Sequence, residues 1–211
     1  MSNDHYFTAQ PASKDERRLV SVRLDGRDVE VETAGGIFSP GRLDLGTQVL
    51  LRSVPEPPQT GNLLDVGCGW GPVALTLALQ APGAAVWAVD VNERALDLTR
   101  RNAARLGLEN VTACRPEDVP DDVRFAALWS NPPIRVGKDV LHDLLRTWLP
   151  RLTDDGVAHL VVQRNLGADS LQGWIAREIR PDVTRAASAK GFRVLRVGPG
   201  TAAVPGATPT E

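Results

Sequence analysis

The chain has 211 residues, of which 42% are hydrophobic and 24% charged, and its formal net charge at pH 7 is −2. This hydrophobic content suits one domain with a sizeable core and excludes a chain that is disordered throughout. Because no run of eighteen apolar residues occurs and the first residues lack a charged-then-apolar signal pattern, we expect a soluble cytoplasmic protein that makes no membrane contact.

An N-terminal arm and a β-hairpin open the chain. Residues 1–16 turn polar after His5-Tyr6-Phe7, so a loose arm is expected there. Residues 19–24 and 29–33 alternate apolar and polar side chains around Asp25-Gly26, which predicts two antiparallel strands. The hairpin should act as a cover for the segments that follow it.

A short cover segment separates this hairpin from the first apolar strand. Glycines and a proline at positions 35–41 end the alternating pattern, and residues 44–51 predict a short helix. A proline-rich link at residues 55–58 then leads into the core. We therefore divide the chain into three predicted parts: an arm, hairpin and cover at residues 1–58, a core at residues 59–198, and a disordered tail at residues 199–211.

Strands and helices alternate through the middle of the chain. The predicted strands are residues 63–66, 86–90, 110–114, 125–129 and 157–162. The predicted helices are residues 72–79, 93–106, 141–149 and 170–179. A closing antiparallel pair is expected at residues 183–187 and 192–197. This order predicts an α/β fold with a doubly wound, mostly parallel seven-stranded sheet, an antiparallel last strand and an N-terminal β-hairpin cover.

The most informative turn joins the first predicted core strand to its helix. Its sequence is Asp65-Val66-Gly67-Cys68-Gly69-Trp70-Gly71, and glycine is needed where the backbone bends sharply and approaches a ligand. Asp90 ends the next strand, where an acid can accept hydrogen bonds from both hydroxyls of a ribose. A dinucleotide site would show Gly-x-Gly-x-x-Gly, so this spacing favours a different adenosyl ligand, while an ordinary glycine-rich loop is the plain alternative.

A second turn, Ser130-Asn131-Pro132-Pro133, follows the fourth predicted core strand. The two prolines hold the Asn131 side chain and the Pro132 carbonyl in a stiff arrangement. Both oxygens can accept hydrogens from a planar amine and aim its lone pair at an electrophile, so catalysis would depend on positioning and needs no strong base. The plain alternative is a turn that only ends a strand. Parallel topology places Gly67, Asp90, the loop after Cys114 and Asn131 at one rim of the sheet.

The cysteines and histidines give no metal-binding pattern. Cys68 and Cys114 are the two cysteines, and the position of Cys68 within the glycine turn favours reduced thiols over a disulfide. The histidines at positions 5, 142 and 159 stand singly in the sequence. We therefore predict that the protein holds no metal.

These motifs resemble those of the methyltransferase small-domain family, which includes ribosomal RNA guanine-N2 methyltransferases. The resemblance is carried by His5-Tyr6-Phe7, Gly36-Ile37-Phe38-Ser39, Asp44-Leu45-Gly46-Thr47, the glycine turn, Asp90-Val91-Asn92 and residues 130–138. It implies a Rossmann-like class I methyltransferase fold, S-adenosyl-L-methionine as the cofactor, and transfer of a methyl group to a nitrogen of a nucleobase.

The resemblance also implies roles for individual residues. The expected cofactor-binding residues are Asp65, Gly67, Cys68, Gly69, Gly71, Asp90, Val91 and Asn131, with Glu117 or Asp118 facing the adenine. The expected catalytic residues are Asn131, Pro132 and Pro133. The candidate substrate-binding residues are Phe38, Ile134, Arg135 and Lys138. Trp70 either flanks the cofactor or packs in the core.

The chain departs from the family pattern in two ways. Ile134 stands where the family usually has an aromatic residue that stacks on the target base, so another group must help to hold a planar target. Phe38 is the candidate, and a role as a core plug is the alternative. The bacterial ribosomal enzymes typically carry an extra N-terminal copy of the domain, which this sequence does not show, so the substrate or the RNA-binding surface should differ.

We expect an N-methyltransferase that acts on guanine N2 of ribosomal RNA, with ribosomal RNA or a ribosomal subunit as its partner. Basic side chains at residues 181–198, together with Arg135, Lys138 and Arg164, either contact phosphates or simply face solvent. The alternative acceptors are adenine N6 in RNA or DNA, a glutamine side-chain amide and a small-molecule amine. A non-catalytic cofactor- or RNA-binding protein is the alternative from another class.

Overall fold

The computed structural model describes residues 16–199, except for the side chain of Arg135. The predicted N-terminal arm and the predicted disordered tail fall almost entirely on residues 1–15 and 200–211, which lie outside the described residues. Across residues 16–199, no helix has the length and apolar character that crossing a membrane requires.

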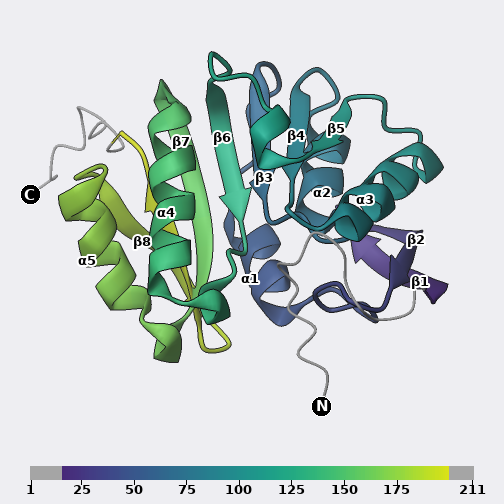
Figure 1. The fold of residues 1–211 in the computed structure, drawn as a ribbon, viewed down its shortest axis with the longest axis horizontal. Helices are drawn as coiled ribbons and strands as arrows, with labels where there is room; N and C mark the ends of the chain where they lie inside the picture. The colour runs from purple at the N-terminus through teal and green to yellow at the C-terminus, as the bar shows by residue number, and fades with distance from the viewer. Residues whose placement is uncertain (1–15, 200–211) are drawn as a thin grey trace, which may run out of the picture.

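The predicted hairpin is present as strands β1 (Arg17–Leu24) and β2 (Arg27–Ala34). Leu24 pairs with Arg27 across the two-residue turn, where Asp25 and Gly26 both have positive φ, as the tight twisted hairpin turn requires. The buried side chains of the hairpin pack against α2 and α3, so this separate two-stranded sheet covers one side of the core (Figure 1).

Seven strands form the main sheet, as predicted. They are β3 (Asn62–Val66), β4 (Ala85–Val89), β5 (Val111–Cys114), β6 (Phe125–Ser130), β7 (Leu152–Gln163), β8 (Val183–Ala189) and β9 (Phe192–Val197). Their order is β5-β4-β3-β6-β7-β9-β8. Strand β9 runs antiparallel to both of its neighbours, so the last strand in the chain is antiparallel to the rest of the sheet.

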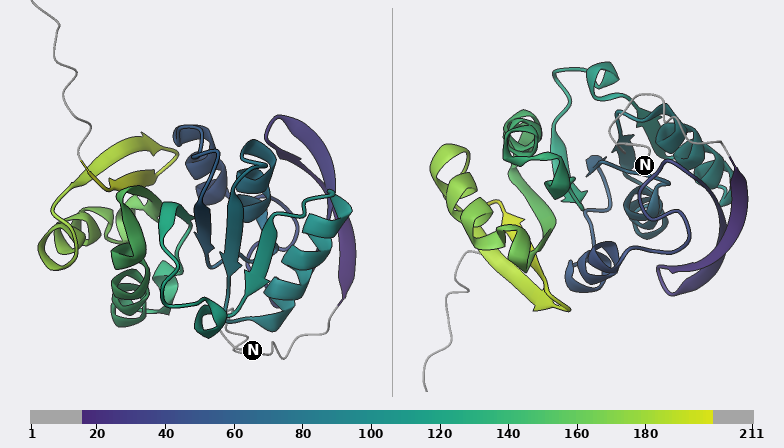
Figure 2. Two further views of the ribbon diagram at one scale, coloured as in Figure 1. Left: turned by 90° about the horizontal axis from the view of Figure 1, so that it is seen from above. Right: turned by 60° about the horizontal axis from the view of Figure 1, so that its bottom comes forward.

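Helices cover both faces of this sheet (Figure 2). They are α1 (Leu45–Ser53), α2 (Pro72–Gln80), α3 (Glu93–Arg105), α4 (Lys138–Trp148) and α5 (Ala168–Glu178). Short 3-10 turns lie at Pro116–Asp118, Ile134–Val136, Leu149–Arg151 and Arg164–Leu166. Helices α1, α2 and α3 contribute to one apolar cluster and α4 and α5 to another, so the predicted doubly wound architecture is confirmed.

Strand β7 begins five residues earlier, and helix α4 three residues earlier, than the apolar patterns predict. Strand β7 starts at Leu152 because Leu152 pairs with Phe125 of β6, and the polar residues 153–156 lie in an irregularity of the register before Val157 pairs with Ala127. A Cβ on Gly156 would lie 2.6 Å from the Phe125 carbonyl oxygen, so only glycine fits there. Helix α4 starts at Lys138, since Gly137 has a positive φ and ends the preceding turn.

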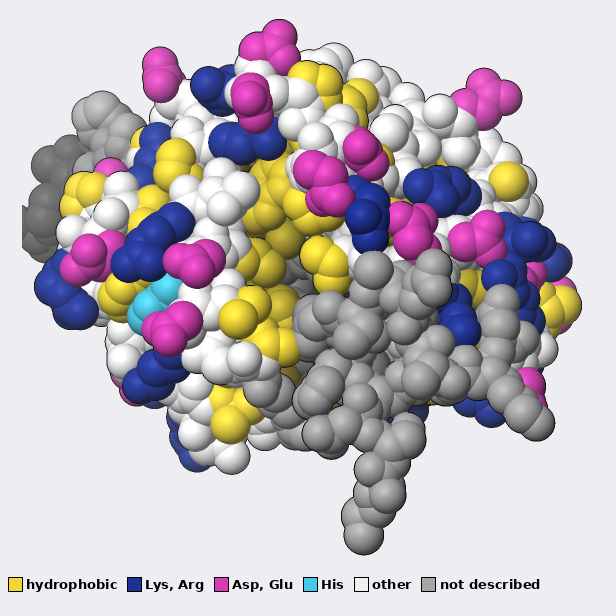
Figure 3. Space-filling model, in the orientation of Figure 1, with side chains coloured by type: hydrophobic (Ala, Val, Ile, Leu, Met, Phe, Trp, Pro, Cys, Tyr) yellow, Lys and Arg dark blue, Asp and Glu magenta, His cyan; other side chains and the backbone are white. Residues whose placement is uncertain are grey.

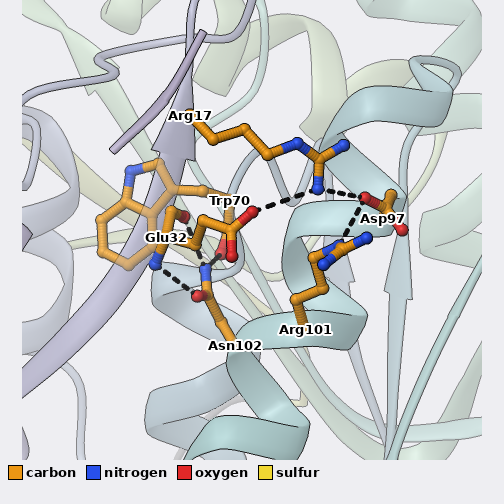
Figure 4. A network of polar contacts seen from close by, with 6 residues as sticks. All are labelled: Arg17, Glu32, Trp70, Asp97, Arg101 and Asn102. Atoms are coloured by element: carbon orange, nitrogen blue, oxygen red, sulfur yellow. Dashed lines mark hydrogen bonds and ion pairs between the residues drawn. The ribbon is translucent and has the colours of Figure 1, made fainter. Parts of the chain in front are cut away.

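A buried amide joins the hairpin to the glycine turn (Figure 4). The Asn102 side chain donates to the carbonyl oxygens of Glu32 and Trp70 at 3.0 and 2.9 Å, and it accepts from the Glu32 N–H at 2.6 Å. Around it, Arg17 bridges Glu32 and Asp97 at the surface. One side chain of α3 therefore ties the cover to the turn that carries the glycines.

Replacing this amide should cost substantial stability. The variant Asn102→Ala leaves two carbonyls and one N–H without partners in a fully buried site, so we expect the free energy of unfolding to fall by about 3 kcal/mol. The neighbouring variant Arg101→Ala removes only an exposed ion pair with Asp97 and should change it by less than about 0.5 kcal/mol. Urea unfolding of both variants tests this difference, and equal losses would contradict it.

Candidate active site

The carboxyl ends of β3 and β4 are held together by the glycine turn. The N–H groups of Gly67 and Cys68 both donate to the Val89 carbonyl, at 2.8 and 3.1 Å. The Gly69 N–H donates to a carboxylate oxygen of Asp90 at 3.0 Å. Gly67, Gly69 and Gly71 all have positive φ, so the three alternating glycines are needed for the path of the backbone at this rim.

Asp90 lies at the tip of β4, facing the turn. Its second carboxylate oxygen accepts from the Asn92 N–H at 2.9 Å, and Asn92 in turn caps α3. Burial raises the pKa of Asp90, while the N–H groups of Asn92 and Gly69 oppose that rise. The rim thus presents a fixed carboxyl group beside the backbone of the glycine turn.

Asp65 lies deeper, at the end of β3. Its carboxyl group accepts from the Ala74 N–H of α2 at 3.0 Å and is 1% exposed. Burial raises its pKa to about 8, with a smaller contribution from the charge of Asp90. At neutral pH this carboxyl group therefore keeps its proton, although an exposed aspartic acid would be ionised.

The Asp65 carboxyl group should make the stability depend on pH. The pKa of Asp65 is higher in the folded state than in the unfolded state. The contribution of Asp65 to the free energy of unfolding is therefore fully present below about pH 4 and is lost as the pH rises to about 8. Asp65→Asn keeps the shape and the acceptor for Ala74 but cannot titrate. We expect the variant to gain stability relative to the wild type between pH 5 and pH 8 in urea unfolding, and a constant difference would contradict the assignment.

Asn131 is held in one orientation by the first turn of α1. Its Nδ2 donates to Asp44 Oδ2 at 2.9 Å and to Thr47 Oγ1 at 3.1 Å. A carboxylate can only accept, so the nitrogen of the amide must face Asp44, and the Oδ1 atom points away from α1. Asp44 also caps α1 through the N–H groups of Gly46 and Thr47, at 2.8 and 3.2 Å.

The proline turn after Asn131 is itself rigid. Pro133 has φ −75° and ψ 76°, and the Ile134 N–H donates to the Pro132 carbonyl at 2.9 Å, which is an inverse γ-turn. One lone pair of that carbonyl remains available. The Ser130 hydroxyl donates to the Val66 carbonyl at 2.6 Å, so the end of β6 is tied to the start of the glycine turn.

A cavity of about 480 Å³ follows this rim and has the size of a small-molecule site. In Figure 3, hydrophobic side chains gather along a recess in the middle of the face shown. The lining of the cavity includes the predicted site residues Phe38, Gly67, Gly69, Asp90, Asn131, Pro132, Pro133 and Ile134. A smaller adjoining pocket is lined by Asp65, Cys68 and Thr47, and the residues common to both pockets are Phe38, Asp44, Gly67, Gly69 and Asn131.

Other predicted site residues lie away from the lining of this cavity. Glu117 forms an ion pair with Arg115, and Asp118 accepts from the Arg115 N–H, both on the 3-10 turn after β5. The remaining predicted residues that do not line the cavity are Gly71 at the start of α2, Val91 beside Asp90, and Lys138 at the start of α4. The Arg135 side chain lies outside the described part of the chain.

The structure also describes the surroundings of Trp70, Phe38 and the two cysteines. Trp70 is 2% exposed and packs in the core between the hairpin and α3, and it also contributes to the lining of the smaller pocket. Phe38 is 49% exposed and lines both pockets, so its side chain is not a buried core plug. Both cysteines are free thiols, and the described residues contain no cluster of side chains suited to a metal ion.

Sequence reasoning missed the side chains that orient Asn131. Asp44 and Thr47 are more than eighty positions away in the chain, and only the packing of α1 against the end of β6 brings them together. The available signal was the N-cap pattern at Asp44, which predicts a helix start but says nothing about the other partner of the carboxylate. The residues from β7 and β9 that line the cavity were also missed.

Comparisons with known proteins identify the family of this chain. The model of the family described as "Methyltransferase small domain" matches residues 28–196. The protein YbxB of Bacillus subtilis is 32% identical over 197 residues, covering 92% of this chain and 98% of YbxB. Ribosomal RNA small subunit methyltransferase C of Ectopseudomonas mendocina is 34% identical over 183 residues, covering 84% of this chain and 53% of that protein.

A solved structure shares the fold. The 16S rRNA N2 methyltransferase RsmC of T. thermophilus, in complex with AdoMet and guanosine, superposes with a TM-score of 0.76 and 24% sequence identity. The match covers 89% of this chain and 52% of that one. The chain therefore spans about half the length of these two ribosomal RNA methyltransferases and nearly all of YbxB.

Proposed function

The chain belongs to the methyltransferase small-domain family, and we propose that it is an S-adenosyl-L-methionine-dependent N-methyltransferase that acts on guanine N2 of ribosomal RNA. The observation that carries the proposal is the orientation of Asn131. Its amide nitrogen is bound by Asp44 and Thr47, so its oxygen is free to accept a hydrogen from an acceptor amine.

The rim beside Asn131 suits the cofactor. The Asp90 carboxylate uses each of its oxygens for one backbone N–H and keeps lone pairs that can accept from two ribose hydroxyls. Gly67 and Gly69 expose backbone with little side-chain bulk nearby, and no heavy atom lies within 4 Å of a Cβ built on Gly69. When bound, S-adenosyl-L-methionine supplies a methyl group on a positively charged sulfur that leaves as a neutral thioether.

The protein's part in the reaction is then one of positioning. A guanine N2 amine is planar because its lone pair is delocalised into the ring. Asn131 Oδ1 and the Pro132 carbonyl accept its two hydrogens and favour a pyramidal nitrogen whose lone pair points at the methyl group. With the cofactor bound, the nitrogen held by these two oxygens would take the methyl group as the carbon–sulfur bond breaks, and its surplus proton would pass to water.

Ribosomal RNA is the favoured acceptor because two of the relatives described above carry that substrate in their names. The family includes proteins that share only about half their length with this chain, so we assign the acceptor to this chain as a proposal. With ribosomal RNA as the acceptor, we propose that the reaction takes place in the cytoplasm. Adenine N6 and a glutamine amide would present the same kind of planar nitrogen to Asn131, and a small-molecule amine is the remaining alternative acceptor.

Labelled methyl transfer tests the acceptor. Ribosomal subunits from a strain lacking the protein are incubated with the purified protein and S-adenosyl-L-methionine carrying a labelled methyl group, and the RNA is digested to nucleosides. We expect the label in N2-methylguanosine. Label in another methylated nucleoside, in protein or in a small metabolite would replace the acceptor and leave the methyltransferase assignment in place.

A further inference from the structure

One wall of the cavity has no role in the reaction described above. It is formed by Gln163 at the end of β7, Leu166 in the following turn, Lys190 in the turn between β8 and β9, and Phe192 at the start of β9. Because β9 is antiparallel, its first residue lies at the same rim as the last residue of β7. Across the rim, Asp90 and the glycine turn lie on one side of Asn131, and this wall lies on the other.

Phe192 lies close to the groups that hold Asn131. A Cβ on Gly46 would lie 3.0 Å from Cε1 of Phe192, so the ring packs directly on the backbone of α1. The next residue, Thr47, accepts from the Asn131 amide at 3.1 Å. An aromatic face therefore stands beside the proposed catalytic amide, although Ile134 is at the family's usual position for an aromatic residue.

Gln163 is the cross-strand partner of Phe192. Directly opposite residues of an antiparallel pair place their side chains on the same face, roughly 5 Å apart at Cβ. Within residues 16–199, the Gln163 side-chain amide makes no hydrogen bond. An unpaired amide offers two donor hydrogens and one acceptor oxygen, which is a set that can read the edge of a purine.

Lys190 completes the wall with a positive charge. It has φ 49° in a tight turn with Gly191, whose carbonyl accepts from the Arg164 N–H at 2.8 Å, so the turn is fixed to the end of β7. Lys190 is exposed and lines the cavity, where it can meet a phosphate that follows a bound base. The aromatic face can stack on a base, the unpaired amide can form hydrogen bonds with the edge of that base, and the cation can bind its phosphate.

We propose that Phe192 and Gln163 form the recognition wall for an unstacked purine nucleotide of RNA, with Phe192 stacking on the base, Gln163 reading its edge and Lys190 binding its phosphate. This inference rests on the proposed methyltransferase function. It selects a nucleotide over a glutamine side chain or an alkyl amine, because neither of these has an aromatic face or a phosphate for the wall to bind.

The test measures binding of guanosine monophosphate to the protein saturated with S-adenosylhomocysteine, by ligand-observed NMR titration. Phe192→Leu keeps an apolar side chain and loses the aromatic face, so we expect about ten-fold weaker binding, whereas Phe192→Tyr keeps the face and should stay within about two-fold. Gln163→Leu should also weaken binding about ten-fold because it leaves the base edge unpaired.

Charge variants on the hairpin of β8 and β9 test the phosphate contact. Lys190→Glu should weaken binding of guanosine monophosphate about ten-fold and leave binding of guanosine within about two-fold. Arg185→Glu makes the same change of charge on β8, where Arg185 does not line the cavity, and should change neither. Ribose 5-phosphate should bind at least about ten-fold more weakly than guanosine monophosphate.

Each outcome decides between the two proposals. Equal affinity of the wild type and Phe192→Leu for guanosine monophosphate, or binding of a glutamine-containing peptide in place of the nucleotide, would overturn the recognition wall. If S-adenosylhomocysteine still binds the wild type and Asn131→Ala still loses turnover, the methyltransferase proposal stands in that case. Failure of the wild type to bind S-adenosylhomocysteine would overturn both.

Discussion

Asn131→Ala is expected to lower the rate of methyl transfer by about 10²- to 10³-fold at saturating cofactor, the usual effect of removing one preorganised hydrogen-bonding group from a reaction centre. The dissociation constant of S-adenosyl-L-methionine should change far less than the rate, because Asn131 is one of several expected cofactor-binding residues and the ribose contact is assigned to Asp90. Single-turnover methylation and isothermal titration measure the two quantities separately.

Asp44→Asn tests the orientation of the Asn131 side chain without removing that side chain. Asparagine also caps helices, so α1 should keep its start, but the carboxylate that fixes the Asn131 amide is lost. Because both amide orientations then become possible, we expect a loss of about ten-fold in rate with unchanged cofactor binding. For Asn131→Ala, a rate of methyl transfer equal to that of the wild type would contradict the catalytic role and leave the proline turn with a structural role alone.

Asp90→Ala is expected to weaken binding of S-adenosyl-L-methionine by at least about 100-fold, since two hydrogen bonds from ribose hydroxyls to a carboxylate are lost. It also removes the acceptor of the Gly69 N–H, so the glycine turn loses one of its supports. Isothermal titration measures the affinity, and thermal unfolding separates loss of binding from loss of folding.

Glu93→Ala provides the comparison for Asp90→Ala. Glu93 is an acid three positions further along, at the start of α3, and its carboxylate pairs with Arg115 at 2.7 Å and does not line the cavity. It should leave cofactor affinity within about two-fold. Equal heats of binding for the wild type and Asp90→Ala would remove the assigned role of this aspartate.

Much of the fold could be predicted because its local signals are strong. The apolar runs of β3, β4 and β6 and the amphipathic pattern of α3 mark buried strands and a half-buried helix. Parallel topology then brings strand ends to one rim, where Gly67, Asp90 and Asn131 line one cavity as predicted, whereas Glu117 and Asp118 in the loop after Cys114 do not line it. The roles assigned to individual site residues stay predictions.

The remaining features depend on tertiary contacts that leave no local pattern. Residues 153–156 of β7 are polar and show no strand pattern, and the strand begins before them only because Leu152 pairs with Phe125 of β6. Asp44 reads as an ordinary helix cap until the fold places its carboxylate against Asn131. Phe192 reads as one apolar residue of a closing strand, and only the antiparallel direction of β9 brings it to the rim.

A crystal structure of the protein with S-adenosylhomocysteine and guanosine monophosphate tests the central claim most directly, because the claim is a juxtaposition of atoms. We expect the guanine N2 amine to lie within hydrogen-bonding distance of Asn131 Oδ1, with the sulfur on the opposite side of that amine and the ribose on Asp90. A cofactor bound elsewhere, or an Asn131 side chain turned away from both molecules, would contradict the assigned reaction.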